Sequence, residues 1–403
     1  GFILPHKFFQ TQYGEPLRKL IADNKSLSKI VDFTTNQIFE NATTYTCLLF
    51  LSKKENKEFK YLKLALKDDF VNLDKKENFE IMPSSKLKSN VWCFHTLAAS
   101  KVVEKLNLVQ TKLVDITKKI FKGSSTGNDK IYLLRLIKEK DKTCVVFSEQ
   151  VDKEIELEKN ILKPFLFGSD IKKYGGPQTK IRILFPYEIV GDRVNLIPIE
   201  KLKKEYPLSF EYLSSVKLIL MNRKIDHAAN DFYKYSAARS LIEYNQTKIM
   251  IPDILVENRI TIDLNGSFYH GPAIHSIVFN EKVKNYNPLF FLGIFNSKLF
   301  WFYLTQTSTA LRGNAYRLIP QFLEPFPIKL INFNDPSEKA IHDKLVSLVD
   351  RMLELHKKKN SLPPSAEREK IEREIAVTDE KIDEIVYGLY GVTDEERRTI
   401  EGN

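Results

Sequence analysis

The chain has 403 residues, 43% of them hydrophobic and 28% charged, with a formal net charge of +10. That length holds two or three domains with a sizeable core, and the composition is that of a soluble globular protein. A membrane span is excluded, because Leu289–Leu304, the most apolar region, is interrupted by polar residues and is shorter than the roughly 20 apolar residues that a span needs. We expect this region to be core.

The charge is unevenly distributed along the chain. Residues 336–403 carry twelve Lys and Arg against sixteen Asp and Glu, so residues 1–335 carry +14. A basic body with an acidic tail predicts a polyanionic partner, although a lysine-rich solvated surface would give the same balance. The cysteines Cys47, Cys93 and Cys144 lack metal-ligand spacing and predict reduced, buried thiols in a cytoplasmic protein.

The first 52 residues predict alternating elements. Phe2–Leu4, Lys29–Phe33 and Thr44–Leu51 are typical of strands, and Gly14–Asp23 of a helix. Strand–helix–strand order indicates part of an α/β sheet. Residues 56–80 are polar and rich in Lys and Asp, and we expect an irregular crossover that extends to about residue 85.

Residues 86–335 mix short β-rich runs with helices, spaced by Gly, Pro and Asn. They predict one mixed α/β domain. From residue 336 the apolar positions recur at three- and four-residue steps, interrupted by the Pro-containing segment Ser361–Ser365. Two helices joined by a short turn form an antiparallel hairpin, and Thr393 with Glu396 suits a capping box that opens a last short helix.

A glycine–hydroxyl–glycine segment follows residue 122. Gly123 and Gly127 bracket Ser124, Ser125 and Thr126, with Lys122, Asn128 and Lys130 beside them. Such a loop can present backbone N–H groups and hydroxyls to an anion, because glycine permits close approach. A plain loop or hairpin is the alternative interpretation.

Two further segments combine basic residues with aromatic residues or asparagine. We expect Arg223 and Lys224 to follow an apolar strand, and Tyr233, Lys234, Tyr235 and Arg239 to lie shortly after them. Leu311–Arg317 places Arg312, Asn314, Tyr316 and Arg317 around Gly313. Basic side chains contact phosphates, Arg and Asn read guanine and adenine edges, and aromatic rings stack on displaced bases. Surface ion pairs and packed tyrosines are the alternative for each residue.

Five segments follow one another in this order: ILKPFLFGSDIKKYG (Ile161–Gly175), ILFPYEI (Ile183–Ile189), FYKYSAARSL (Phe232–Leu241), LGIFNSKLFWFYL (Leu292–Leu304) and LRGNAYRLIPQFLEPFPI (Leu311–Ile328). Together they resemble the target-recognition region of Type IIG restriction–modification enzymes. The relatives of these enzymes are adenine-specific DNA methyltransferases with a TaqI-like C-terminal specificity domain. The first 52 residues resemble the last strands of their catalytic domain, and Ile382–Glu396 their usual ending.

The resemblance implies a mixed α/β fold with four parts: the end of a Rossmann-like methyltransferase sheet (1–55), a crossover (56–85), a DNA target-recognition domain (86–335) and a helical spacer (336–403). It also implies that this is the C-terminal part of a longer enzyme. That parent would use S-adenosylmethionine, and magnesium if it also cleaves DNA. Double-stranded DNA and the parent's own catalytic domain would be the partners.

The family's catalytic motifs are not found in this sequence. Asn287–Phe290 lacks the second proline of the N-P-P-Y motif that holds a flipped adenine, and no two of the 15 glycines are two positions apart, as the cofactor loop requires. We therefore expect no catalytic, cofactor or metal residues here. Asp253, Glu257 and Arg259 only approximate a nuclease motif, and His270 and His275 are expected in a loop.

The sequence thus predicts a DNA-recognition fragment that is inactive on its own. Two alternatives stay open. One is a stand-alone specificity subunit that works with separate modification subunits, and the other is a metal-dependent DNA nuclease.

Overall fold

The computed structural model describes residues 1–34, 36, 38–41, 44–64, 79–92, 94, 97–191, 193–226, 228, 230–311 and 313–402. The N-terminal part forms a five-stranded sheet in the order β1-β3-β2-β4-β5. Its elements are β1 (Phe2–Pro5), α1 (Glu15–Asp23), β2 (Leu27–Asp32), β3 (Thr46–Leu51), β4 (Glu58–Lys63) and β5 (Glu80–Pro83). β2 and β4 are parallel and the other pairs are antiparallel. The three predicted strands and the helix are confirmed, with small differences at their ends.

The prediction of an irregular crossover from residue 56 is wrong for two segments. β4 and β5 are strands of the first sheet, and β4 pairs with both β2 and β5. In β4 the buried side chains of Phe59, Tyr61 and Leu62 are interspersed with exposed Glu58 and lysines. The charged outward positions gave this stretch a polar composition and hid its apolar inward face. Residues 65–78 lie outside the described part.

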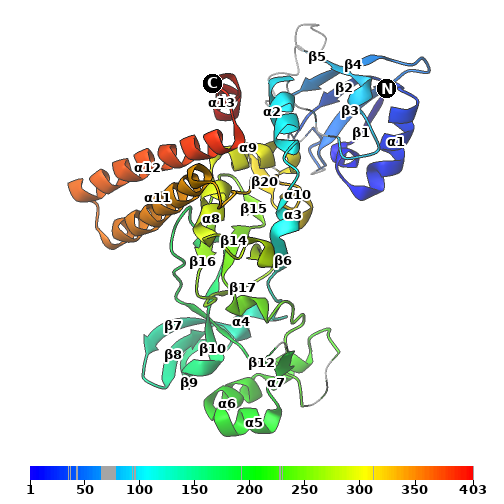
Figure 1. Cartoon of the computed structure of the whole chain (residues 1–403). Coiled ribbons are helices and arrows are strands. Elements are labelled where there is room, and N and C mark those ends of the chain that lie inside the picture. Colours follow the sequence, from blue (N-terminus) through cyan, green and yellow to red (C-terminus); the bar gives the residue numbers. More distant parts are fainter. Residues whose placement is uncertain are drawn as a thin grey trace.

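Two larger sheets form the middle of the chain. The four-stranded antiparallel sheet has the order β16 (Thr261–Asp263), β14 (Lys248–Pro252), β18 (Ile274–Phe279) and β6 (Thr117–Lys122). The six-stranded sheet has the order β17 (Tyr269–His270), β10 (Leu162–Leu166), β11 (Ile181–Leu184), β7 (Leu133–Glu139), β8 (Thr143–Ser148) and β9 (Lys153–Glu158). Figure 1 shows the six-stranded sheet at the end of the molecule away from the first sheet.

Smaller elements complete this region. Two strand groups are β12 (Tyr187–Val190) with β13 (Arg193–Leu196), and β15 (Ile254–Leu255) with β20 (Ala315–Arg317) and β19 (Ala310–Leu311). The helices are α2 (Leu97–Asn107), α3 (Leu113–Ile116), α4 (Asp129–Tyr132), α5 (Ile199–Glu205), α6 (Pro207–Ser215), α7 (Lys217–Met221), α8 (Pro288–Asn296), α9 (Lys298–Thr307) and α10 (Pro320–Leu323). The mixed α/β class is confirmed.

Helices α8 and α9 form the centre of the largest hydrophobic core. Nearly all of their apolar side chains are buried, and they pack between α2, the four-stranded sheet and the C-terminal helices. Gly293 lets α8 approach α11, because a Cβ there would lie 2.9 Å from side-chain carbons of both Leu345 and Val349. The prediction that Leu289–Leu304 is core is confirmed. Within the described residues no helix is long and apolar enough to cross a membrane.

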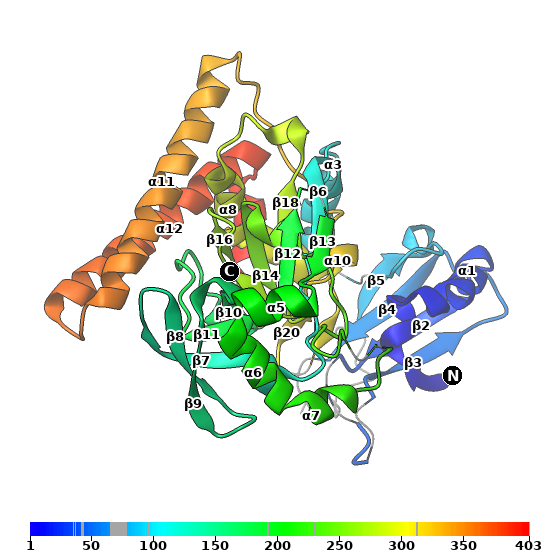
Figure 2. The same ribbon diagram turned by 90° about the horizontal axis from the view of Figure 1, so that it is seen from below.

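The C-terminal part is the predicted helical hairpin. It consists of α11 (Pro336–Ser361), α12 (Ala366–Tyr390) and the short α13 (Asp394–Glu401). Thr393 and Glu396 form the predicted capping box at the start of α13. Figures 1 and 2 show that α11 and α12 project on the side of the molecule opposite the first sheet.

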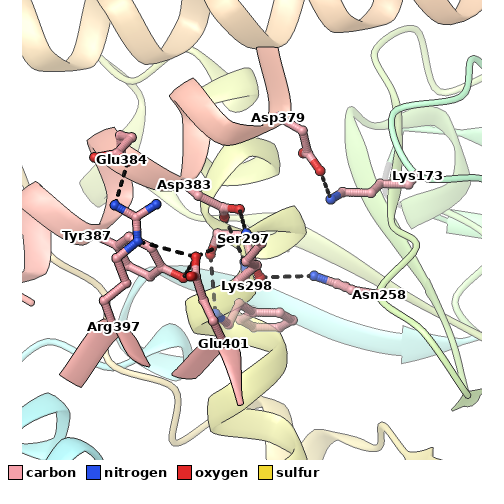
Figure 3. A network of polar contacts seen from close by, with 11 residues as sticks. Lys173, Asn258, Ser297, Lys298, Asp379, Asp383, Glu384, Tyr387, Arg397 and Glu401 are labelled. Carbon is pink, nitrogen blue, oxygen red and sulfur yellow. Dashed lines mark hydrogen bonds and ion pairs between the residues drawn. The ribbon is translucent and has the colours of Figure 1, made fainter. Parts of the chain in front are cut away.

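A polar network fixes the hairpin to the middle of the chain (Figure 3). The Asp383 carboxylate on α12 accepts a hydrogen bond of 2.8 Å from the backbone N–H of Lys298, which begins α9. On the other side of the same peptide bond, the Ser297 carbonyl accepts a hydrogen bond of 3.2 Å from the Asn258 amide. Lys173 and Asp379 add an ion pair of 2.6 Å. Asp383 is 2% exposed, so it carries most of the electrostatic cost of this junction.

Burial raises the pKa of Asp383 to about 6, with a further contribution from Asp379, while Lys173 and Lys298 oppose the shift. Because the folded chain holds this proton more tightly than the unfolded chain, the group's contribution to stability is present below about pH 4 and is lost as the pH rises towards 6. We expect Asp383→Asn, which keeps an oxygen for the Lys298 N–H, to remove a pH dependence on the order of 3 kcal/mol.

Urea denaturation at pH 4 to 7.5 measures this effect. Asp350→Asn is the control, because its carboxylate is exposed on α11 and has no partner among the described residues. An Asp383→Asn variant with the same pH slope as the parent would contradict the assignment.

Candidate nucleic-acid interface

The segment after β6 is shaped by two glycines. A Cβ on Gly123 would lie 1.8 Å from the carbonyl oxygen of His270, so no other residue fits without moving the backbone. Gly127 has a φ of +81°, and a Cβ there would lie 2.8 Å from the Cβ of Ser236. The close approach predicted for these glycines is therefore an approach to the protein's own backbone.

The loop's N–H groups are used inside the protein. Ser124 donates its N–H to the Tyr244 hydroxyl at 3.1 Å, and Ser125 donates to the carbonyl of Ala237 at 3.1 Å. Ser124 and Thr126 are buried. The structure thus differs from the expectation that this loop presents its N–H groups to an anion. Its function is to hold neighbouring segments.

Arg223 lies against this loop, and its side chain is hydrogen-bonded to backbone carbonyls inside the protein. Its guanidinium donates to the carbonyls of Thr126 at 2.7 Å, Phe232 at 2.6 Å and Leu220 at 3.0 Å. The element before it is helix α7, which corrects the expected apolar strand, because Lys217–Met221 completes a helical run that begins with α6. Lys224 beside it is exposed, and His227 lies outside the described residues.

Tyr233 and Tyr235 are core residues. Their hydroxyls donate to the carbonyls of Ile197 at 2.6 Å and Leu184 at 2.7 Å, and both side chains are buried. Burial raises the pKa of Tyr233 to about 12 and also raises that of Tyr235. In this conformation neither ring is available for base stacking. Lys234 forms an ion pair of 2.8 Å with Asp231.

Arg239 is the exposed member of this segment. Its backbone N–H donates to the Ser124 hydroxyl at 3.0 Å, and that hydroxyl donates to the Arg239 carbonyl at 2.9 Å. The Arg239 guanidinium has no partner among the residues that the structure describes. The glycine loop therefore fixes the backbone of Arg239 and leaves its side chain at the surface.

The β19–β20 hairpin carries the third predicted segment. Gly313 and Asn314 have φ values of 78° and 56°, which make a tight left-handed turn with Asn314 exposed. Tyr316 packs edge-on against Trp301, with ring centroids 5.7 Å apart, whereas Arg317 is exposed. Arg312 lies outside the described residues.

Asp253 joins this hairpin to the end of β6. Its carbonyl accepts the N–H of Leu318 at 2.8 Å, and its carboxylate lies 3.5 Å from the Lys122 ammonium. Arg317 is paired with Ile254, the residue after Asp253. Asp253 therefore links Lys122 to β20, the strand that carries Arg317.

These contacts hold residues 223–239 against the glycine loop and link the β19–β20 hairpin through Asp253 to Lys122, which directly precedes the loop. We call the solvent-facing side chains of this region the loop surface. Its members are Lys122, Ser125, Asn128, Lys130, Lys224, Arg239, Asn314 and Arg317.

The residues that approximate a nuclease motif serve the fold. The Asp253 carboxylate lies 3.4 Å from His275 Nε2, and Arg259 donates to the carbonyls of Gly168 and Ile171. His270 and His275 are buried strand residues, which corrects the expected loop, because β17 and β18 turn tightly at Gly271. Burial lowers the pKa of both histidines, to about 3 for His270. Within the described residues no group of three His, Cys, Asp or Glu could hold a metal ion.

Sequence reasoning missed a pocket between the first sheet and the β19–β20 region. It has a volume of about 100 Å³ and is lined by His6, Asp32, Tyr61, Trp92, Phe94, Thr309 and Tyr316, among others. Asp32 accepts hydrogen bonds from His6 at 2.8 Å and from the Tyr61 hydroxyl at 3.3 Å. The signal was a histidine directly after β1 and an aspartate at the end of β2. It can be recognised only when both strands are known to pair with β3.

Comparison with known proteins identifies the class to which these features correspond. Residues 163–328 match the TaqI-like C-terminal specificity domain, and residues 1–39 match the Eco57I restriction-modification methylase family. The predicted resemblance to restriction–modification enzymes is therefore confirmed.

Individual relatives extend the similarity over the whole chain. The chain is 29% identical to the Type II restriction enzyme and methyltransferase RM.Eco57I of Escherichia coli, over 100% of this chain and 42% of that protein. It is 22% identical to the Type II methyltransferase M.HindII of Haemophilus influenzae, over 87% of this chain and 68% of that one. The Type IIL restriction-modification enzyme MmeI, solved in complex with DNA, shares the fold, with a TM-score of 0.56 at 14% identity over 99% of this chain and 48% of that one.

A substitution in the glycine loop tests the close approach of Gly123 to the His270 carbonyl. We expect Gly123→Ala to destabilise the chain by about 2 kcal/mol or more, because the added Cβ overlaps the His270 carbonyl. Gly176→Ala is the matched control, since a Cβ there meets nothing within 4 Å. Chemical denaturation measures both variants, and equal free energies of unfolding would refute the close approach.

Proposed function

We propose that this chain recognises a DNA sequence within a restriction–modification enzyme of the Type IIG kind. The observation that carries the proposal is the loop surface, where three basic segments far apart in sequence meet around one glycine loop. Two of these segments lie within the part that matches a specificity domain. The net charge of +14 on residues 1–335 supports a polyanionic partner.

The exposed residues divide by chemistry. Lys122, Lys130 and Lys224 carry point charges suited to backbone phosphates. Arg239, Arg317 and Asn314 have the planar donor groups that read guanine and adenine edges in the major groove, and Arg312 is proposed with them from the sequence. In contrast, Ser124, Thr126, Arg223, Tyr233 and Tyr235 are engaged internally and position the others.

In the whole protein we propose that a methyltransferase domain completes the catalytic unit. The chain spans 42% of the length of RM.Eco57I, and its residues 1–39 match a methylase family. Exposed apolar side chains in the N-terminal part support such a neighbouring domain, which would cover them. They are Phe2, Ile3, Tyr13 and Leu20, which are 50–69% exposed.

S-adenosylmethionine would be the cofactor of the whole protein, where it would supply the methyl group, and magnesium would serve a parent that cleaves DNA. The residues of this chain do not fit S-adenosylmethionine, because no glycine-spaced loop follows a strand to approach it. We therefore derive no step of methyl transfer from these residues.

The two alternatives are less well supported. A stand-alone specificity subunit does not account for the first sheet, and co-purification with separate modification subunits would establish it. A metal-dependent nuclease requires clustered carboxylates, and the described residues offer no such cluster. Magnesium-dependent plasmid cleavage by this chain would establish the nuclease instead.

DNA binding should depend strongly on salt. We expect weak binding to duplex DNA whose log K falls with log salt at about −0.9 per phosphate contacted. Fluorescence anisotropy with a labelled duplex at 50–200 mM salt measures the slope. Affinity that is insensitive to salt would contradict an electrostatic interface.

Replacement of the exposed arginines tests the assignment of residues. We expect Arg239→Ala and Arg317→Ala each to cost about 1–3 kcal/mol on cognate DNA and to relax specificity at one base pair. Lys224→Ala should weaken all sequences alike. Lys357→Ala and Lys358→Ala are controls on the acidic hairpin, and we expect them to change affinity little. Specificity is measured by selecting bound sequences from a random DNA library. Losses of affinity no larger than those of the control variants would contradict the site assignment.

A further inference from the structure

Two hollows lie side by side along β10, away from the loop surface. One, of about 430 Å³, is lined by residues that include Lys159, Arg182, Gly266 and Ser267. The other, of about 290 Å³, is lined by residues that include Tyr187, Glu188, Lys201 and Tyr206. Four residues line both hollows and therefore mark their common boundary, namely Asn160, Lys163, Asn245 and Tyr269.

Lys163 is the unusual charge at this boundary. It is partly buried, and its ammonium has no hydrogen-bond or ion-pair partner among the residues that the structure describes. Burial lowers its pKa, and no acidic residue offsets the effect. The two neighbouring lysines are already neutralised, Lys159 by Glu139 at 2.5 Å and Lys201 by Glu188. An ammonium withdrawn from water without a counter-charge is unfavourable, so a bound anion would stabilise it.

Further N–H donors lie at this boundary or beside it. The Asn245 side-chain oxygen accepts a hydrogen bond of 3.1 Å from the Tyr269 hydroxyl, which leaves its NH₂ group free to donate. The Asn160 amide has no partner within the described part of the chain. Arg182 lines the first hollow and donates only to the carbonyls of Thr179 and Ile181. Several N–H donors therefore lie at or beside this boundary.

We propose that Lys163, Asn160 and Asn245 form a binding site for a phosphoryl oxyanion. Several N–H donors that approach from different residues suit a tetrahedral oxyanion, and lysine supplies the point charge. The anion is either a phosphate of a DNA backbone that passes along the six-stranded sheet or a free phosphate. The site goes beyond the proposed function, because none of its residues belongs to the loop surface.

The experiment uses the 403-residue chain with Lys163→Met, which keeps the aliphatic stem and removes the charge. Calorimetric titration with inorganic phosphate, at ionic strength held constant with chloride, should show at least about tenfold weaker binding in the variant. In parallel, anisotropy with duplex DNA should show a salt slope smaller by about 0.9 if a backbone phosphate binds here. Lys153→Met is the matched control, since that lysine is exposed on β9 of the same sheet and lines neither hollow.

The outcomes separate the two sources of phosphate. Loss of phosphate binding alone assigns a free anion, and a reduced DNA slope assigns a backbone phosphate. No change in either measurement overturns the proposal. The melting temperature of Lys163→Met should be equal to or higher than that of the parent, because an uncompensated charge is removed. Asn160→Ala, an exposed position whose amide has no partner within the described part of the chain, should weaken the same binding without loss of stability. Wild-type binding in this variant would also overturn the site.

Discussion

The contact between Gly123 and the His270 carbonyl is the constraint on which the loop surface depends. It lets β6 of the four-stranded sheet end directly against β17 of the six-stranded sheet. Tyr244 reinforces the junction, since its hydroxyl donates to His270 at 2.6 Å and accepts from Ser124. From this point the loop fixes Arg239 through Ser124 and Arg223 through Thr126. One backbone approach that requires glycine therefore holds against the loop two residues that lie 97 and 115 positions away in sequence.

Much of the fold could be predicted because its signals are local. Periodic apolar residues predicted the hairpin from Pro336 onward, and the pair Thr393 and Glu396 predicted its last cap. β4 could not be predicted from composition, because its lysines and glutamates face solvent while Phe59 and Tyr61 face the core. Likewise α7 resembled a strand, since five residues are too few for helical periodicity to appear. Where β-strands pair over long separations, no local pattern specifies the partner.

The candidate site was predictable in its segments and less so in its individual residues. Residue type cannot distinguish an arginine that donates to three internal carbonyls, such as Arg223, from one with a free side chain, such as Arg239. Tyrosines in a basic segment suggest base stacking, yet Tyr233 and Tyr235 bury their rings and direct their hydroxyls to carbonyls. Burial depends on which segments pack together, and that is decided by tertiary contacts such as the one at Gly123.

Site-specific photo-crosslinking to DNA tests the central claim most directly. A photoreactive phenylalanine analogue is placed in turn at Asn314 and Lys224, which are exposed on two separate segments of the loop surface, and at Lys358 on the hairpin. If three segments form one DNA-facing surface, the first two positions crosslink to a radiolabelled duplex, excess unlabelled duplex suppresses the product, and Lys358 gives none. Crosslinking from Lys358 but from neither Asn314 nor Lys224 would contradict the account.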